Sequence, residues 1–266
     1  NLGKTHPVLI NGQERAGAET FEVRSPIDRD IVVGRFVAGT EDDVNDAVAA
    51  AKAAYPGWSK MPWQERVAII RRAAELIRER KFDLAAILIM EAGKNRVEAI
   101  GEVEEAADML DEYTRQMEQH DGFVRRLGTI DPGERNHSVL KPFGVWAVLA
   151  PFNFPHALSI GMSSGALLAG NTVVYKPASA TPLSGYEIAR IYTDAGMPAG
   201  VFNFVTGSGE AVGSPLTHHP DVDGVIFTGS KVVGWDLYKE FSTEFPKPCI
   251  TELGGKNPTI VTAKAD

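Results

Sequence analysis

The stretch GVWAVLAPFNFPHALSIGMSSGALLAGNTVVYKP, residues 144–177, carries the clearest indication of the fold class. It starts with a short apolar run (144–151), continues through a segment of helical character (155–169) and ends in a second apolar run (171–177). A strand, a helix and a second strand in this order predict a parallel βαβ unit.

The same alternation continues towards the C-terminus. Strands are predicted at 201–207, 223–229 and 248–253, and helices near 182–195, 209–218 and 231–243. Short strands rich in β-branched and aromatic residues that alternate with helices predict an α/β protein with a doubly wound parallel sheet.

The first third of the chain is predicted to be helical. Helices are expected over the ranges 41–54, 63–80, 82–90 and 95–119, and Tyr55-Pro56-Gly57-Trp58 is expected to break the first of them. Two strands at 123–130 and 138–142, joined by a polar turn, predict a hairpin arm, and a further strand is predicted at 258–263.

Acidic residues crowd the helix predicted at 95–119. A metal or acid–base cluster is one interpretation, but charge runs usually face water, and a solvated helix face is favoured. The residues concerned are Glu102, Glu104, Glu105, Asp108, Asp111 and Glu112.

The composition excludes several classes of protein. A net charge of −8 and a pI near 5.3 argue against a general binder of nucleic acid or anionic membranes. Neither a membrane-spanning run nor a signal-peptide pattern is recognised. The single cysteine, Cys249, excludes an intrachain disulfide framework and a thiolate zinc site, and a reducing, cytoplasmic location is expected. No metal site is predicted.

Polar or glycine-rich residues follow each predicted strand of the sheet. In an open parallel sheet, ligands bind outside these carboxyl ends. Asn153 lies between Phe and Pro residues after the first strand, where the alternative is a simple turn Asn. Lys176 ends the second strand and could equally be a surface lysine. Thr228-Gly229-Ser230 leads into a predicted helix, where Ser230 suits a phosphate site or a plain N-cap.

Two further residues could carry chemistry near the last predicted strand. Glu252 ends this strand and could activate a water as general base, or it could cap a turn. Cys249 is a possible nucleophile, but strand alternation places it on the face opposite Glu252, and a packed core thiol is favoured. GSGEAVG (207–213) resembles a dinucleotide fingerprint with one residue too many, and it alone is a weak signal.

Five motifs together resemble the aldehyde dehydrogenase superfamily. They are PFNFP, LLAGNTVVYKPAS, GVFNFVTG, VDGVIFTGS and ITELGGKNP, and their order and spacing also agree. Within the superfamily, the sequence looks most like the 1-pyrroline-5-carboxylate (glutamate semialdehyde) dehydrogenase branch. The resemblance implies a Rossmann-like NAD(P)-binding fold and oxidation of an aldehyde to a carboxylic acid through a cysteine thioester.

The resemblance also implies roles for individual residues. Asn153 matches the oxyanion donor and Glu252 the general base that activates the hydrolytic water. Lys176 matches a contact to the adenosine ribose, Ser230 the pyrophosphate site, and Gly209 and Val212 the wall beside the adenine. The remaining implied cofactor contacts are Pro151, Phe152, Pro177, Ala178, Ser179, Phe227, Thr228, Gly229, Val233, Leu253 and Gly254.

Two departures from the family pattern matter. Ser179 stands where NAD-preferring members often have Glu, so NAD is expected as cofactor with NADP as an alternative. The family's nucleophilic cysteine lies beyond Asp266 and Cys249 does not match it, so this chain alone is expected to be inactive. A CoA-acylating semialdehyde dehydrogenase and a noncatalytic nucleotide-binding module remain as alternatives.

The resemblance divides the chain into four parts. They are an N-terminal helical part of the cofactor-binding domain (1–120), an oligomerisation hairpin (121–143), a Rossmann-like NAD(P)-binding domain (144–253) and the start of a truncated catalytic domain (254–266). The expected partners are a small aldehyde and, in the complete protein, further copies of the same chain. Neither nucleic acid nor membrane is expected to bind.

Overall fold

A seven-stranded sheet forms the centre of the computed structural model, which describes residues 2–265. The strand order is β12 (Cys249–Glu252), β11 (Gly224–Thr228), β8 (Val145–Leu149), β9 (Thr172–Lys176), β10 (Phe202–Phe204), β2 (Val8–Ile10) and β3 (Gln13–Arg15). The strands from β12 to β10 run parallel, and β2 and β3 add antiparallel pairs at one edge.

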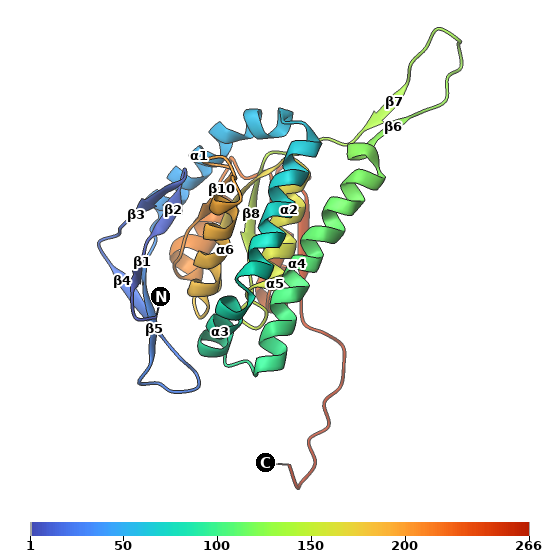
Figure 1. Ribbon diagram of the computed structural model, residues 1–266. Coiled ribbons are helices and arrows are strands. Elements are labelled where there is room, and N and C mark those ends of the chain that lie inside the picture. The colour runs from blue at the N-terminus through green and yellow to red at the C-terminus, as the bar shows by residue number, and fades with distance from the viewer. Residues whose placement is uncertain (1, 266) are drawn as a thin grey trace.

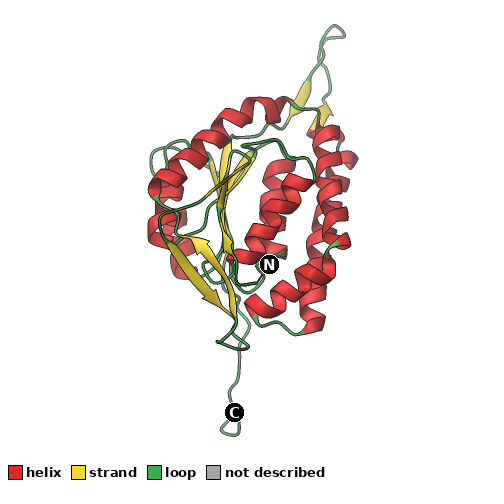
Figure 2. Ribbon diagram, turned by 60° about the vertical axis from the view of Figure 1, so that its left-hand side comes forward, coloured by secondary structure: helices red, strands yellow, loops and turns green. Residues whose placement is uncertain are grey.

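Helices cover both faces of this sheet (Figures 1 and 2). One face carries α1 (Glu41–Lys60), α7 (Ser214–His218) and α8 (Lys231–Glu240). The other carries α5 (Ala157–Leu168) and α6 (Pro182–Asp194), which α2 (Trp63–Glu79), α3 (Lys81–Ala92) and α4 (Arg96–Gln119) cover in turn. Because helices bury both faces, every side chain of β9 is buried, and the predicted doubly wound α/β fold is confirmed.

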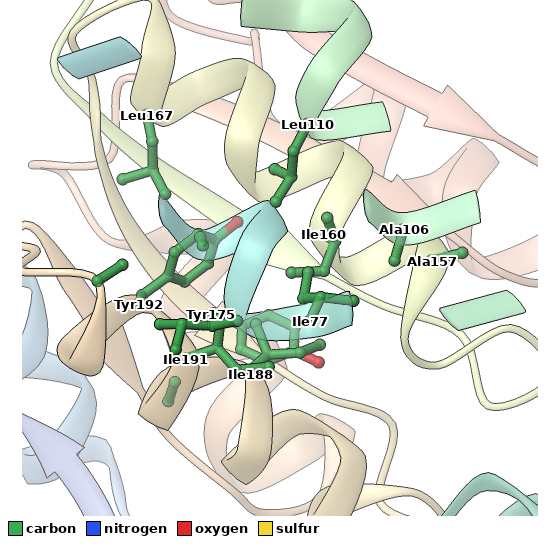
Figure 3. Close-up of a cluster of buried hydrophobic side chains, with 14 of the residues drawn as sticks. Ile77, Ala106, Leu110, Ala157, Ile160, Leu167, Tyr175, Ile188, Ile191 and Tyr192 are labelled. Atoms are coloured by element: carbon green, nitrogen blue, oxygen red, sulfur yellow. The ribbon is translucent and has the colours of Figure 1, made fainter. Parts of the chain in front are cut away.

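The larger hydrophobic core lies between the sheet and helices α2 to α6 (Figure 3). Tyr175 of β9 and Tyr192 of α6 are almost fully buried there, beside Ile160 of α5. Their hydroxyls find partners on α5, at 2.8 Å from Ser159 Oγ and 3.0 Å from Ser163 Oγ respectively. Burying such side chains stabilises the fold by roughly 1.5–3 kcal/mol each. The first hydrogen bond ties α5 to β9, and the second ties α5 to α6.

The first 40 residues correct the prediction of a helical first third. They form β1 (Thr5–His6), β4 (Thr20–Arg24) and β5 (Val32–Val37), which pair in the order β1-β5-β4, in addition to β2 and β3. These strands are short, and exposed polar residues interrupt their apolar ones. The alternation of buried and exposed residues that identifies a strand is therefore hard to recognise in the sequence. Two of the pairings are local, since β2 and β3 form a hairpin across Asn11-Gly12 and β4 pairs with the next strand, β5. The pairings of β1 with β5 and of β2 with β10 join segments that lie farther apart in the sequence.

Helix α1 is longer than predicted, because it continues through Pro56 to Lys60. A proline inside a helix removes one backbone hydrogen bond. Here Trp58, which is 2% exposed, holds the last turn by packing in the core and by donating from Nε1 to the Leu167 carbonyl at 2.9 Å. This tertiary contact outweighs the local break.

The predicted hairpin arm projects from the body (Figure 1). It follows a short 3₁₀ turn, η1 (Asp121–Phe123). Its strands β6 (Val124–Arg126) and β7 (His137–Val139) are shorter than expected, and each of their residues is exposed. The predicted strand at 258–263 is wrong, since none of the described residues after β12 pairs with a neighbouring strand.

Candidate functional site

The order in which strands are added to the sheet reverses at β8. From β8 the chain proceeds to β9 and β10 on one side, and it then returns to place β11 and β12 on the other side of β8. Leu149 at the end of β8 pairs with Lys176 on one side and with Phe227 on the other. The polar strand ends predicted from the sequence therefore meet at one edge, at the switch point where such folds bind ligands.

A groove of about 350 Å³ opens at this edge, and we call it the first groove. It lies between α7 and α8, over the ends of β8, β9 and β11. Its walls include four of the predicted cofactor residues, namely Lys176, Gly209, Phe227 and Val233.

Lys176 places a buried cation at the first groove. The side chain is 7% exposed, and its Nζ donates to the neighbouring Pro177 carbonyl at 3.1 Å. Within residues 2–265 no carboxylate pairs with it. Burial lowers the pKa of Lys176 to about 8, because a charged amine is costly away from water. An ammonium held in this way favours a ligand that brings oxygen acceptors.

The N-terminus of α8 lies beside the same edge. Ser230 is its N-cap, and the serine Oγ accepts from the Val233 N–H at 3.4 Å. Gly234 lets the helix lie close to β12, because a Cβ there would be 2.1 Å from Leu253 Cδ2. The remaining free N–H groups and the positive end of the helix dipole suit a phosphate.

The glycine-rich segment 207–213 contains a single π-helical turn, η2 (Gly209–Gly213). Ser208 caps this turn, because its Oγ accepts a hydrogen bond from the Ala211 N–H at 2.9 Å. Gly209 is exposed and borders the first groove. Val212, in contrast, is fully buried and packs in the second core with the side chains of α1. The role of Val212 as a wall beside the adenine stays a prediction.

The other predicted cofactor residues differ in exposure. Pro151 and Pro177 are buried, Ala178, Gly229 and Leu253 are half-buried, and Phe152, Ser179 and Gly254 are exposed. The hydroxyl of Ser179 donates to the Gly207 carbonyl at 2.9 Å, which ties the loop after β9 to the loop after β10.

Glu252 lies on a second groove, of about 630 Å³, beside α4 and α5. The side chain is exposed, and Ile250 and Thr228 share this wall with it. Cys249 packs against the core on the other face of β12, as strand alternation predicted, and burial raises the pKa of its thiol. Cys249 is therefore a poor nucleophile.

Asn153 lies in an exposed bend between β8 and α5, and its side-chain amide makes no hydrogen bond with the described part of the chain. The next residue, Phe154, makes a cation–π contact with Lys94, whose Nζ lies 3.5 Å from the centre of the Phe154 ring. Lys94 in turn pairs with Glu102 at 2.7 Å. The loop is thus anchored, while the amide of Asn153 is left free for a ligand.

The burial of Glu102 corrects the interpretation of all acids on α4 as a solvated face. Glu102 is 2% exposed. A signal for this was available, because Ala99, Glu102, Val103 and Ala106 follow helical i, i+3, i+4, i+7 spacing, and all four are buried. Glu102 therefore lies within the apolar stripe of α4. The sequence analysis grouped it with the other acids of this helix and so missed its burial.

The residues at the edge fit a dinucleotide. The first groove has apolar walls for a base, Lys176 offers a buried donor, and the α8 N-terminus offers free N–H groups near the strand ends. Within the described residues no group of three or more His, Cys, Asp or Glu side chains could hold a metal ion. No described helix is long and apolar enough to cross a membrane.

Comparison with known proteins agrees with this geometry. Residues 13–266 match the model of the aldehyde dehydrogenase family. The chain belongs to this family. A 1-pyrroline-5-carboxylate dehydrogenase of Anoxybacillus flavithermus is 38% identical over 271 residues, which cover 100% of this chain and 52% of that protein. A 1-pyrroline-5-carboxylate dehydrogenase 2 of Bacillus subtilis is 38% identical over 273 residues, with the same coverage of both chains.

Solved structures of the family share the fold. A 1-pyrroline-5-carboxylate dehydrogenase from Thermus with bound NAD superposes with a TM-score of 0.90 at 35% identity, over 96% of this chain and 50% of that one. Proline utilization A from Bdellovibrio bacteriovorus gives a TM-score of 0.91 at 35% identity, over 95% and 27%. The chain spans about half the length of the 1-pyrroline-5-carboxylate dehydrogenases it matches, and these matches bear out the predicted family and branch.

Proposed function

We propose that this chain supplies the cofactor-binding half, the oxyanion donor and the general base of an NAD(P)-dependent dehydrogenase that oxidises glutamate semialdehyde to glutamate. The observation that carries the proposal is the meeting of three strand ends at one edge. The Asn153 loop follows β8, the first groove opens beside β8 and β11, and Glu252 ends β12. The substrate is inferred from the branch to which the similar proteins belong.

The cofactor side of the site is built from Lys176, Ser230 and the walls of the first groove. Lys176 would donate to the hydroxyls of the adenosine ribose, and the N–H groups behind Ser230 would bind the diphosphate. When bound, NAD(P) accepts the hydride that the aldehyde carbon loses. Ser179 brings no carboxylate near the ribose, so a 2′-phosphate is not repelled there, and NADP is an alternative cofactor.

The chemical side is built from Asn153 and Glu252. The amide of Asn153 would donate a hydrogen bond to the oxygen that becomes negative when a cysteine thiolate attacks the aldehyde. Hydride loss then leaves a thioester. Glu252 would take a proton from a water that attacks this thioester, which releases the carboxylic acid and the thiolate. Cys249 would not supply the required cysteine, because it packs against the core on the other face of β12, and the matched 1-pyrroline-5-carboxylate dehydrogenases are about twice as long as this chain.

The same proposal assigns roles to the four parts of the chain. Residues 1–120 and 144–253 would form the cofactor-binding domain, residues 121–143 an arm for another subunit, and residues 254–266 the start of a catalytic domain. Support for the arm comes from its strand edges and apolar side chains, such as Ile130, which is 99% exposed.

The experiment that tests the function compares Asn153→Ala with the unmodified complete protein, meaning this chain with any sequence that continues it. We expect glutamate semialdehyde oxidation with a kcat that falls about 10²–10³-fold in the variant, the typical loss for one oxyanion donor. Asn45→Ala, which removes an exposed amide on α1 away from the arm and from both grooves, is the control. Absence of aldehyde oxidation, or an unchanged kcat in Asn153→Ala, would refute the proposal.

A further inference from the structure

One buried carboxylate caps the helix that follows the Asn153 loop. Helix α5 receives no side-chain cap from its own N-cap residue, His156. Instead Glu102 of α4 accepts hydrogen bonds at Oε1 from the N–H groups of His156, at 2.7 Å, and Ala157, at 3.2 Å. A carboxylate at a helix N-terminus satisfies free donors and matches the helix dipole. The start of α5 is thus fixed by a residue distant in sequence.

A half-buried cation, Lys94, links that carboxylate to the loop itself. Lys94 Nζ lies 2.7 Å from Glu102 Oε2, and the two side chains are 10% and 0% exposed. The same Nζ lies 3.5 Å from the centre of the Phe154 ring, a close cation–π contact. Lys94 and Glu102 therefore hold both Phe154 and the first residues of α5, on the C-terminal side of Asn153.

We propose that the Lys94–Glu102 pair positions the amide of Asn153 for the oxyanion. The proposal rests on the function proposed above and deepens it, because neither residue touches the reacting atoms. The bend at Asn153 lies outside regular secondary structure, so its direction depends on its anchors. A donor that moves by about 1 Å can lose about a hundredfold in rate. Loss of the pair would move the amide and slow the chemical step.

A purely structural role for the pair is the competing explanation, and the fold supplies a matched comparison. Glu91 is equally buried and caps α6 in the same way, accepting from Leu183 N at 2.6 Å and from Ser184 N at 2.8 Å. No cation or aromatic contact links Glu91 to the Asn153 loop among the residues that the structure describes. Glu91→Gln therefore weakens a buried cap of the same kind without releasing the loop.

The kinetic test uses Lys94→Met in the complete protein, alone and combined with Asn153→Ala. We expect Lys94→Met to lower kcat about 10- to 100-fold, with little change in the KM for NAD. In the Asn153→Ala background the same change should have no further effect, because its only route to the reaction is already removed. Lys94→Arg should restore most of kcat, because it keeps the charge and can stack on Phe154.

Two kinetic results would overturn the proposal. One is an equal loss of kcat from Lys94→Met in both backgrounds, which indicates a general effect on the fold. The other is a comparable loss of kcat in Glu91→Gln, which indicates that any weakened buried cap has the same consequence.

A second readout does not depend on activity. Hydrogen exchange of the His156 and Ala157 amides should become at least about tenfold faster in Glu102→Gln and in Lys94→Met. In Glu91→Gln the faster exchange should instead appear at Leu183 and Ser184. If the complete protein oxidises no aldehyde, the proposed function fails, yet this experiment still decides whether the pair holds the loop. Unchanged exchange at His156 and Ala157 in both variants would overturn the pair's role.

Discussion

At the scale of single residues, Lys176 is the clearest mark of a binding site. Burial of its amine without a carboxylate partner costs stability, because the pKa of Lys176 is lowered to about 8 from an ordinary value near 10.5. Such a cost is seldom retained in a groove wall unless the charge serves binding. The sequence indicated only that a cation stands at a strand end, and its burial required the fold.

The lowered pKa predicts how dinucleotide affinity depends on pH. The Nζ of Lys176 is charged below about pH 8 and neutral above it, and only the charged form attracts the ligand's oxygens strongly. The affinity for NAD should be constant from pH 6.5 to 7.5 and fall about tenfold by pH 9.5. Calorimetric titration of the complete protein at several pH values measures this.

Two variants make the pH prediction specific. Lys176→Met should bind NAD weakly, with an affinity that stays flat across the range, whereas Lys4→Met, which removes an exposed charge, should behave like the unmodified protein. An unmodified affinity that does not change between pH 7 and 9.5 would show that Lys176 does not bind the cofactor as a cation.

Glu102 shows where residue-level prediction fails. The sequence predicted the same solvent-exposed position for Glu102, Glu105 and Asp108, although of these three only Glu102 lies within the apolar stripe of α4. A buried carboxylate becomes recognisable only when its donors are known, and those come from His156 and Ala157, more than fifty residues away. Local pattern could have indicated its burial, but not its partners.

At the scale of elements, the strands of the parallel sheet were predicted well. The predicted ranges 144–151, 171–177 and 223–229 enclose β8, β9 and β11, because each is a short, continuous apolar run between polar turns. The strands before residue 40 were missed because they are short, with two to six residues each, and several have exposed polar residues among the apolar ones. Their pairings are partly local, as in the β2–β3 hairpin, and partly distant, as between β2 and β10. The predicted strand at 258–263 has the right composition but pairs with no described strand.

The capping of α6 gives a prediction about stability. Burial raises the pKa of Glu91 to about 7, although its hydrogen bonds with Ser184 and Leu183 lower it in part. The ordinary value in the unfolded chain is about 4.5. A raised carboxyl pKa contributes stability that is fully present below about pH 4.5 and is lost as the pH rises through about 7. The free energy of unfolding should therefore lose about 1–3 kcal/mol of this contribution between these pH values.

Urea unfolding from pH 4.5 to 8 measures this contribution. Glu91→Gln should remove it, so that the difference between variant and unmodified protein changes with pH in the stated direction. Glu65→Gln, which changes an exposed acid on α2, should leave the pH dependence intact. A Glu91→Gln curve parallel to that of the unmodified protein would show that Glu91 titrates normally in the folded state.

At the scale of the whole molecule, the sheet separates two surfaces that the proposed reaction would use together. The first groove lies beside α7 and α8, the second beside α4 and α5, and Phe227 contributes to both walls. Composition and motifs predicted the fold class, and the polar strand ends that they singled out meet at one edge of the sheet. They could not predict that Val212 packs inward or that Glu252 lies on the second groove, because both depend on how helices dock on the sheet.

The projecting arm leads to a prediction about assembly. Its two strands have three residues each, and a hairpin of this size is marginal in water without a partner edge. We expect the complete protein to be a homo-oligomer. Replacement of residues 124–139 by a short glycine linker should remove at least one contact between subunits and so lower the mass of the oligomer. Light scattering after size exclusion measures the mass. An unchanged mass without the arm would exclude it from assembly, and Ile130→Ser offers a milder version of the test.

The most direct test of the account is a rapid-mixing measurement of NADH formation from glutamate semialdehyde by the complete protein and its Glu252→Gln variant. Continuous NADH formation is expected from the unmodified protein. In the variant we expect a burst of about one NADH per site, followed by turnover that is slower by at least about 100-fold, because the thioester forms but water is no longer activated. Steady turnover of Glu252→Gln at the unmodified rate, or no NADH from either protein, would contradict the account.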